Sequence, residues 1–463
     1  MISIMNENDM LKDLCGKEIT YGLYEPVLGD ISIYSLIRHR VRYKFMEKCG
    51  FPAMKLQSKL VYFAAIKSIF LSSFQLMRLW IFRKTYSTVF YAFPRVDKIG
   101  GVYIDKFTDP LIDACDLKQD YLILDHGRAG IHPKPRAHSE KIVYTDLLEV
   151  FSFVYVSLKY KVFYNKYRKE FDQLHLSIVK GMGIDYRKDE MVKHFFITYV
   201  YALQLKALFR HISAKRVLGP ARALMYGSFY AAHCLGMDSF ELQHGITYGE
   251  SVLYSGYRDP MIMPDYFFAF GNNRPLDVYG IDEKKIINVG WALNNYLNNC
   301  NKEEKYFPTD VLVISDPEIT DNLLAAVVKL AEATPESTYY IRTHPHETLN
   351  SDQLSLIDSK NNIKIQDKSI NISVVLQAFH QVIGVDSTVL YEALAVNKKV
   401  GKLFMNGLEP HYLEESDREC FWEIHNEEDV DFFIKGKVED KKSKCIYSPF
   451  DKKKFLFITG ISE

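Results

Sequence analysis

Short apolar runs alternate with longer amphipathic stretches over residues 310–404. The runs are rich in β-branched residues and end in polar or turn-forming residues, a pattern typical of buried strands. The stretches between them have the length of helices. We therefore expect strands at 310–316, 338–345, 363–367, 381–387 and 398–404, and helices at 318–333, 350–358, 370–380 and 388–396. This alternation predicts a parallel sheet covered by helices on both faces.

A second series of short apolar runs occupies the earlier part of the chain. It predicts strands at 88–93, 121–127, 141–146, 265–271 and 285–290. Residues 147–212 predict long helices with a break near KGMGIDYRKDE, and residues 215–245 predict one βαβ unit. The first part of the chain predicts mostly helix. The fold class expected is therefore α/β, with two Rossmann-like domains and extra N-terminal helices.

The length of 463 residues favours two domains, because a single hydrophobic core stops growing well below this size. An Asn- and Lys-rich, weakly patterned stretch at 291–309 predicts a linker. We place the first domain at 1–290 and the second at 310–463, with the last helix free to return to the first domain. Two such domains form a cleft between the carboxyl ends of their strands, where ligands bind in this architecture.

Composition narrows the classes of function. The 58 basic and 58 acidic residues balance, which argues against a general nucleic-acid binder. Seven cysteines without a CxxC pair indicate a reduced, intracellular protein without a zinc finger. The N-terminus has no basic stretch followed by an apolar one, so no signal peptide is predicted. No uncharged run reaches the ~20 residues of a membrane span, and we expect a cytoplasmic protein.

Residues 59–93 are apolar and aromatic but are interrupted by basic side chains. These are Lys59, Lys67, Arg78, Arg83 and Lys84. One hypothesis is a buried helix followed by a strand. The other is an interfacial patch that makes peripheral contact with an anionic membrane surface, the cytoplasmic face of the inner membrane.

Polar side chains follow predicted strands in three places. The segments are FELQHGI at 240–246, YYIRTHPHE at 339–347 and VIGVDSTVLYEAL at 382–394. The carboxyl ends of parallel strands form the ligand-facing edge of a doubly wound sheet. We therefore expect these segments to line one ligand site, shared between the two domains.

The segment after Gly384 has the features of a phosphate site. Hydroxyls such as those of Ser387 and Thr388, with the free amides of a helix's first turn, bind phosphate with the help of the helix dipole. Asp386 opens the same turn. Glu392, one turn deeper on the same face as Thr388, is placed to reach a ribose hydroxyl. The alternative is that Asp386 or Ser387 is an ordinary N-cap.

A rigid turn is predicted at Thr343-His344-Pro345, because Pro345 excludes the α conformation for the residue before it. Such a turn at a strand end aims the imidazole of His344 at a phosphate oxygen. The alternative is a histidine that only caps a loop. Arg342 alternates to the opposite side of the strand and is expected to serve the fold.

The first domain is expected to supply the catalytic group and the acceptor site. Asp125 ends a predicted strand, where a carboxylate can deprotonate an acceptor hydroxyl or attack an anomeric carbon. The basic side chains that follow it and suit an anionic acceptor are Arg128, His132, Lys134 and Arg136. The alternative is a solvated basic loop with Asp125 as a turn residue. Glu241 is the second candidate for the catalytic carboxylate.

The QHG turn is a further candidate for the first domain's side of the site. Gly245 permits a positive φ, so that His244 or neighbouring amides can approach a ligand closely. Glu241 and Gln243 alternate in direction with Leu242 and His244 if the strand continues that far. One of the two polar side chains, Glu241 or Gln243, is then expected to line the cleft.

These segments resemble GT-B nucleotide-sugar glycosyltransferases that build bacterial capsules and O-antigens. QHG followed by PDYFFAFG and INVG is similar to the N-domain end of the capsule-type enzymes. THP with a later Ser/Thr segment resembles the HP and S/T motifs of bacterial sialyltransferases and Kdo transferases. The resemblance covers mainly residues 215–405. It implies a GT-B fold, and it implies that His344, Ser387 and Thr388 hold the donor phosphate.

The same resemblance extends to catalysis. Asp125-His126-Gly127 resembles the acidic-Gly motif that supplies the base in sialyltransferases, with His126 in place of the second acid. GT-B enzymes in general need no catalytic metal, because positive side chains and helix dipoles stabilise the leaving phosphate. No DxD-like pair lies in a convincing loop, and we expect no metal and no cofactor besides the donor. The spaced acids expected at the surface are Asp109, Asp113 and Asp116.

Three classes of function follow. The first is a glycosyltransferase that extends a bacterial surface polysaccharide, O-antigen or capsule, from a nucleotide-sugar donor onto a lipid-linked or oligosaccharide acceptor. CMP-Kdo or another CMP-linked acidic sugar is the first donor that the resemblance implies, followed by a UDP- or GDP-hexose. The second class is a CDP-glycerol-type polyol-phosphate transferase. The third is a non-catalytic GT-B protein that binds polysaccharide.

Overall fold

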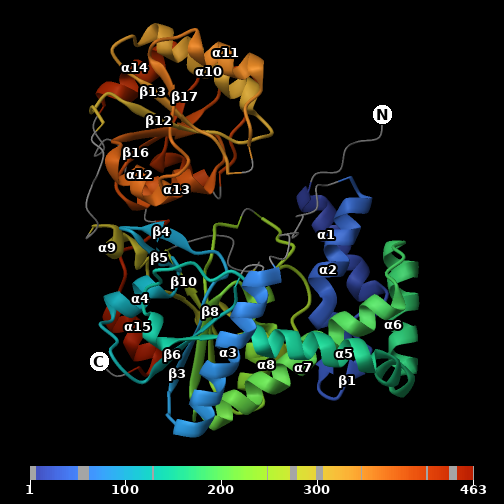
Figure 1. The fold of residues 1–463 in the computed structure, drawn as a ribbon. Coiled ribbons are helices and arrows are strands. Elements are labelled where there is room, and N and C mark those ends of the chain that lie inside the picture. The colour runs from blue at the N-terminus through green and yellow to red at the C-terminus, as the bar shows by residue number, and fades with distance from the viewer. Residues whose placement is uncertain are drawn as a thin grey trace.

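The computed structural model describes residues 7–50, 62–127, 130–247, 249–271, 279–298, 306–345, 347–412, 415–436 and 446–461. These residues form two α/β domains and a helical N-terminal part (Figure 1). In Figure 1 the second domain, in orange, stands above the first, and the N-terminal helices lie to one side.

The first sheet has seven parallel strands in the order β11-β10-β9-β8-β3-β6-β7. The chain enters at the centre through β3, moves to one side through β6 and β7, and crosses back to β8, β9, β10 and β11. This reversal is the doubly wound pattern, with its switch point between β3 and β8. The strands are Thr88–Tyr91 (β3), Tyr121–Asp125 (β6), Ile142–Tyr144 (β7), Arg216–Pro220 (β8), Asp238–Leu242 (β9), Tyr266–Ala269 (β10) and Ile286–Asn288 (β11).

The second sheet has six parallel strands in the order β14-β13-β12-β15-β16-β17. This is again the Rossmann order, with the switch point between β12 and β15. The strands are Val311–Ile314 (β12), Tyr339–Arg342 (β13), Ile363–Ile365 (β14), Gln381–Gly384 (β15), Lys399–Leu403 (β16) and Trp422–Ile424 (β17). The helices are Thr320–Ala333 (α10), Ser351–Asp358 (α11), Ile372–Ala378 (α12), Thr388–Ala395 (α13) and Glu427–Lys435 (α14). The two sheets confirm the predicted α/β class with two Rossmann-like domains.

Helices cover the first sheet and form the N-terminal part beside it. They are Glu7–Thr20 (α1), Ile33–Lys48 (α2), Tyr62–Phe82 (α3), Asp109–Ala114 (α4), Asp146–Lys166 (α5), Arg168–Met182 (α6), Lys188–His211 (α7) and Arg222–His233 (α8). A buried ion pair fixes α1 to α2, with Arg42 Nε 2.6 Å from Glu18 Oε1. Arg42 Nη1 also donates to the carbonyl oxygen of Val252 at 2.9 Å, which ties these helices to the loop after β9.

Helix α3 corrects one expectation. The buried helix predicted within residues 59–93 is wrong, because its large apolar side chains face outward: Phe70 is 75% exposed and Phe74 is 57% exposed. Its inner side combines Leu76 and Leu79 with polar Ser72 and Gln75. The strand expected after it is present as β3.

The two domains meet through α9 (Leu293–Asn298) and through an ion pair. Lys106 Nζ lies 3.3 Å from Glu392 Oε1 on α13. Asn294 Nδ2 on α9 donates to the carbonyl oxygen of Ala395 at 2.7 Å. Lys106 also borders a small hollow at the carboxyl ends of β9, β10 and β11, so the second domain sits at the carboxyl edge of the first sheet.

The end of the chain packs on the first domain. Trp291 N donates to the carbonyl oxygen of Ser448 at 2.9 Å, and Ser448 N donates to that of Phe270 at 2.7 Å. Helix α15 (Lys452–Thr459) then places Phe455 against Phe268 of β10. The segment 446–460 therefore covers the side of the first sheet near β10.

Five short strands were not foreseen from the sequence. They are the edge strand β17, the antiparallel pair β4 (Asp97–Ile99) and β5 (Val102–Ile104), and the pair β1 (Val27–Leu28) and β2 (Ile31–Ser32). Each strand has two or three residues. A run this short shows no measurable alternation of apolar and polar positions, so only its partner strand defines it.

Candidate active site

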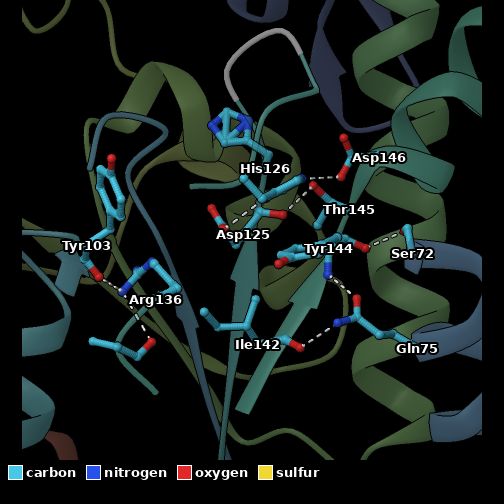
Figure 2. Close-up of polar contacts among 12 residues, drawn as sticks. Ser72, Gln75, Tyr103, Asp125, His126, Arg136, Ile142, Tyr144, Thr145 and Asp146 are labelled. Carbon is cyan, nitrogen blue, oxygen red and sulfur yellow. Dashed lines mark hydrogen bonds and ion pairs between the residues drawn. The ribbon is translucent and has the colours of Figure 1, made fainter. Parts of the chain in front are cut away.

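A histidine lies between two carboxyl groups at the carboxyl end of β6. His132 Nδ1 is 3.1 Å from Asp125 Oδ2, and His132 Nε2 is 2.9 Å from Asp146 Oδ2. The imidazole also stacks on Tyr144, with 3.6 Å between the ring centroids. Figure 2 shows Asp125 at the end of its strand and Asp146 just beyond the neighbouring strand, at the start of α5 (Asp146–Lys166). These residues form the Asp125–His132–Asp146 cluster.

Two adjacent strands and a helix position this cluster. β6 ends at Asp125 and β7 ends at Tyr144, and Thr145 N donates to the carbonyl oxygen of Asp125 at 3.0 Å. Asp146 begins α5, where free amides and the positive end of the helix dipole favour a carboxylate. The side chains of Asp125 and His132 are each 7% exposed and that of Asp146 is 10% exposed, so the cluster is largely shielded from water.

The two carboxyl groups hold a proton on His132. Burial disfavours the charged imidazolium, but the hydrogen bonds and charges of Asp125 and Asp146 outweigh it and raise the pKa of His132 to about 9. Burial likewise acts to raise the pKa of Asp146, but the hydrogen bond and charge of His132 lower it below its ordinary value. At neutral pH the cluster therefore contains a protonated imidazole between two carboxyl groups.

The rest of the predicted basic loop is dispersed. His126 has different neighbours, with its ring centroid 5.6 Å from that of Tyr91 and its Nδ1 atom 3.8 Å from Glu149 Oε1. Arg128 lies outside the described residues. Lys134 is exposed, whereas the side chain of His132 is largely buried and packed against the strand ends.

Arg136 is buried and serves the fold. It forms an ion pair with Asp109 of α4 and donates to the carbonyl oxygen of Tyr103 at 3.3 Å. Asp109 is 0% exposed, so the expectation that it lies at the surface is wrong. Burial raises the pKa of Asp109 to about 7 against the opposing charge of Arg136. The sequence did not predict the burial of Asp109, because its partner Arg136 lies 27 residues away along the chain.

Glu241, the second candidate for the catalytic carboxylate, lies in a buried ion pair. Its Oε2 atom accepts from Arg222 Nε at 2.8 Å, and its Oε1 atom accepts from Arg222 N at 2.8 Å. The two side chains are 0% and 1% exposed. Burial raises the pKa of Glu241, while Arg222 acts in the opposite direction. The pair fixes the start of α8 to β9 beside the switch point.

Gln243 holds the QHG turn to the neighbouring strand. Its Oε1 atom accepts from Phe270 N at 2.8 Å, and its Nε2 atom donates to the carbonyl oxygen of Gly245 at 3.0 Å. Gly245 permits a positive φ but does not adopt one in the structure. These two side-chain hydrogen bonds account for the shape of the turn without left-handed backbone.

His244 is a neutral imidazole close to the domain junction. Its Nδ1 atom lies 3.1 Å from the hydroxyl of Tyr254, and its ring lies 6.1 Å from that of Phe93. Burial, followed by the charge of Lys106, lowers the pKa of His244 to about 4. At neutral pH it can therefore form hydrogen bonds to a ligand but carries no charge.

In the second sheet, the predicted donor residues share one edge. His344 follows β13, and Asp386 and Ser387 follow β15, while β12 lies between these two strands. Strands two apart in a sheet are separated by about 10 Å. The loop after β12, which begins at Ser315, therefore lies between the two predicted halves of the site.

Glu347 shapes the His344 turn. Its buried carboxylate accepts from His344 N at 2.8 Å, from Ser315 Oγ at 2.9 Å and from Thr320 Oγ1 at 2.6 Å. The side chains of His344 and Pro345 are exposed at this edge. As expected, Arg342 serves the fold, and its Nη2 atom donates to the carbonyl oxygen of Ile370 at 2.8 Å.

The turn before α13 combines capping with exposed polar groups. Ser387 is the N-cap, and its Oγ atom accepts from Val389 N at 3.3 Å. Thr388 is exposed, and Glu392 is engaged by Lys106 of the first domain. Asp386 is held by Lys402 Nζ at 3.2 Å and by the amide and imidazole of His411, with N–O distances of 2.9 and 3.0 Å.

Lys402 is a fully buried cation at the carboxyl end of β16. Its side chain is 0% exposed, and Nζ lies 4.4 Å from the ring centroid of Tyr412 and 5.0 Å from that of Phe421. Burial lowers the pKa of Lys402, while Asp386 opposes this effect. Lys402 therefore fixes the carboxylate of Asp386 at the strand edge.

Sequence reasoning did not select Asp146, Glu347 or Lys402. A usable signal existed for Asp146, because it follows a predicted strand in the same way as Asp125 does. Glu347 and Lys402 gave no such signal, since each is identified by partners on other strands. Among the described residues, no group of His, Cys, Asp and Glu side chains is arranged to hold a metal ion.

A hollow of about 570 Å³ lies at the opposite edge of the first sheet. It is bordered by Thr88, Tyr121 and Arg216, which stand at the amino ends of β3, β6 and β8. Ligands of doubly wound sheets bind at the carboxyl ends of the strands. We therefore assign the site to the carboxyl edges, despite the larger hollow at the amino edge.

No family model matches the chain, and no curated protein matches it. Among solved structures, UDP-GlcNAc 2-epimerase from Neisseria meningitidis bound to UDP-GlcNAc has a TM-score of 0.48 and 14% identity, covering 80% of this chain and 98% of that chain. UDP-GlcNAc 2-epimerase from Methanocaldococcus jannaschii has a TM-score of 0.47 and 12% identity, covering 81% and 99%. The lipopolysaccharide outer core galactosyltransferase WaaB in its apo form has a TM-score of 0.42 and 12% identity, covering 75% and 88%. At these values the likeness carries no argument about activity.

Proposed function

We propose that this protein is a glycosyltransferase that moves a sugar from a nucleotide donor to a hydroxyl of a polysaccharide acceptor. The observation that carries the proposal is the Asp125–His132–Asp146 cluster at the carboxyl edge of the first sheet. The second domain adjoins that edge through Lys106 and Glu392. Ligand sites of such folds lie at the carboxyl ends of the strands.

In this proposal Asp125 is the general base. Its carboxylate takes the proton of an acceptor hydroxyl as the acceptor oxygen bonds to the anomeric carbon, and the bond from that carbon to the donor phosphate breaks. The electron pair leaves with the nucleotide phosphate. His132 orients the carboxylate of Asp125 and is itself anchored by Asp146.

The donor phosphate is placed at the carboxyl edge of the second sheet. The hydroxyls of Ser387 and Thr388 and the imidazole of His344 supply the donors of hydrogen bonds, near the positive end of the α13 dipole. The amides of Val389 and Leu390 are already bonded to Ser387. Glu392 is assigned to the ribose, within reach of Lys106. Asp386 acts by holding the turn in place through Lys402 and His411.

In the first domain the proposal gives His244 the role of bordering the acceptor. Gln243 is 1% exposed and holds the turn that carries His244. Glu241 has no catalytic role in the proposal, because its ion pair with Arg222 accounts for its position. A bacterial surface polysaccharide is the proposed acceptor. A CMP-linked acidic sugar such as CMP-Kdo is the first donor to test, because of the resemblance of THP and the Ser/Thr segment. A UDP- or GDP-hexose is the second.

The donor is tested by thermal unfolding of the protein with CMP, CDP, UDP or GDP. A nucleotide at a hundred times its Kd adds ~2.7 kcal/mol to stability, which shifts melting visibly. We expect His344→Ala to lower the affinity for the stabilising nucleotide about tenfold, because one charge-assisted hydrogen bond is lost. His380→Ala is the matched control, since His380 is exposed at the amino end of the same sheet. Unchanged affinity in His344→Ala removes His344 from the site.

Catalysis is tested with Asp125→Asn. We expect transfer to fall about 10²–10⁴-fold while the nucleotide-induced stabilisation is retained. The matched control is Asp238→Asn, because Asp238 is exposed at the amino end of β9. Phosphate in the product would instead identify a polyol-phosphate transferase. A donor sugar altered without any acceptor would identify an isomerase. Ligand binding with no turnover in the native protein would identify a non-catalytic binding protein.

A further inference from the structure

Helix α3 presents an apolar stripe to the solvent. The stripe recurs every three or four residues along one side of the helix, as in the periodic face that usually meets a core. Its side chains are Phe63, Ile66, Phe70, Phe74, Met77 and Ile81, all exposed. A 20-residue stretch of this helix, Phe63–Phe82, is long and apolar enough to span a membrane. Most of its residues are not buried inside the protein.

Helix α5 extends the same surface. Its exposed apolar side chains are Phe151, Val154, Leu158 and Val162, again at helical spacing. The two helices pack against one another where Leu147 N, at the start of α5, donates to Ser72 Oγ of α3 at 3.2 Å, and in Figure 1 α5 runs away from α3 across the first domain. We call this surface the α3–α5 face. Large exposed apolar side chains gathered on two adjoining helices are rare on monomeric soluble proteins and mark an interaction site.

The inner side of α3 explains why the stripe points outward. Gln75 Nε2 donates to the carbonyl oxygen of Ile142 at 3.1 Å, and Gln75 Oε1 accepts from Tyr144 N at 2.9 Å (Figure 2). Ser72 Oγ donates to the carbonyl oxygen of Tyr144 as well. Both polar side chains thus satisfy β7, the edge strand of the first sheet, and they fix the rotation of the helix.

The charge of this face is one-sided, although the whole chain is balanced at 58 basic and 58 acidic residues. Residues 62–84 contain Lys67, Arg78, Arg83 and Lys84 and no acidic residue. Residues 150–166 contain Lys159, Lys161 and Lys166 and likewise no acidic residue. All of these basic side chains are exposed. An apolar surface interleaved with cations complements a bilayer with anionic headgroups.

We propose that the α3–α5 face docks flat on an anionic lipid bilayer, with its apolar side chains among the acyl chains and its lysines and arginines at the headgroups. A second copy of the chain fits less well, because a two-fold contact would oppose two cationic faces and interface cores are depleted in lysine. A transmembrane α3 would break its hydrogen bonds to β7. The inference does not require the proposed sugar transfer.

The proposal has a consequence for the candidate active site. Asp146, which anchors His132, is the first residue of α5, and Ser72 of α3 bonds to Tyr144 beside it. Docking by this face would therefore hold the Asp125–His132–Asp146 cluster close to the headgroup layer. If the proposed transfer is correct, a lipid-linked acceptor would reach the site from the bilayer.

The test is co-sedimentation of the full chain with phosphatidylcholine vesicles, with and without phosphatidylglycerol. We expect binding only when phosphatidylglycerol is present, and weaker binding at high salt. Phe70→Ser, Phe74→Ser and Leu158→Ser should each weaken binding about tenfold, since each removes a large apolar group from the lipid. Phe432→Ser is the matched control, because Phe432 is 70% exposed on α14 of the second domain.

Depth is measured through Trp80, which is 51% exposed on α3. Brominated lipids should quench its fluorescence, and the Trp80→Phe variant should lose that response. Failure to bind anionic vesicles, or an equal loss in Phe432→Ser, overturns the proposal. The proposal is also overturned if the protein binds no vesicles but forms a dimer in solution that Phe70→Ser dissociates. That result would identify a second copy of the chain as the partner of this face. Resistance of the bound protein to alkaline carbonate overturns the flat orientation and favours a spanning helix.

Discussion

At the scale of single residues, the candidate site is defined by one histidine that bridges two strand ends. The sequence identified His132 as one of several basic groups near Asp125, whereas the structure places it against both Asp125 and Asp146. Its protonated state follows from that placement, because two carboxyl groups outweigh the effect of burial on its pKa. The same contacts make it an orienting group for Asp125.

His132 should give the protein a characteristic dependence of stability on pH. The folded state raises its pKa from 6.5 to about 9, so its contribution is complete below about pH 6.5 and is lost as the pH rises through about 9. His132→Gln should lower the free energy of unfolding by roughly 2 kcal/mol near neutral pH and remove this loss. Urea unfolding across that pH range measures both effects, with His380→Gln as control. An unchanged pH profile in His132→Gln would contradict the assigned contacts.

The ion pair of Arg222 and Glu241 should be a determinant of stability. Glu241→Gln leaves a guanidinium buried without a counter-charge, and we expect a loss of about 3–5 kcal/mol. The double variant Glu241→Gln/Arg222→Met should recover part of it, because no charge then remains buried. Thermal unfolding and activity are measured together. A stable but inactive Glu241→Gln would restore Glu241 as a candidate catalytic carboxylate.

At the scale of elements, α3 acts as a cover for the sheet edge. An uncovered edge strand exposes unpaired backbone groups and invites aggregation. Gln75 and Ser72 occupy those groups on β7, in place of a further strand. The polar side chains of α3 therefore face the sheet, and its apolar stripe is exposed at the surface of the protein.

Replacing Gln75 with leucine should loosen this edge. Two hydrogen bonds to β7 are lost, which corresponds to roughly 2 kcal/mol. We expect faster hydrogen exchange at the Tyr144 amide than in the native protein. Gln119→Leu is the control, since Gln119 is exposed. Equal exchange at Tyr144 in both variants would mean that α3 does not protect β7.

At the scale of the whole molecule, polar contacts between the domains within the described residues include an ion pair and a hydrogen bond from Asn294 to Ala395. The ion pair between Lys106 and Glu392 is partly exposed, with side chains at 27% and 11%. Pairs of this kind contribute about 1 kcal/mol or less. The chain also passes from the second domain back to the first, where Ser448 and α15 pack, and this provides a second connection between the domains.

Charge reversal should show whether this ion pair sets the domain arrangement. Lys106→Glu places two carboxylates together, and we expect an increase in the radius of gyration measured by small-angle X-ray scattering. The double variant Lys106→Glu/Glu392→Lys should restore the native value, because the pair is re-formed with its charges exchanged. A double variant as expanded as the single one would show that the ion pair does not govern the arrangement.

The pattern of apolar residues was sufficient to predict the two Rossmann-like sheets and the edge that carries the candidate residues. Strands such as 310–316 and 381–387 occur as β12 and β15, because local periodicity reports whether a segment is buried on both sides. The order of strands then follows from short connections between successive elements. Polar residues at strand ends, including Asp125 and Asp386, were therefore placed at the correct edges.

Only the tertiary structure decided which side chains meet. The pairings of Arg136 with Asp109, Glu241 with Arg222 and His132 with Asp146 depend on contacts between separate elements, which periodicity does not encode. The orientation of α3 was undetermined for a related reason. The helix has apolar residues on both sides, so the hydrogen bonds of Gln75 and Ser72 to β7 decide which side faces outward.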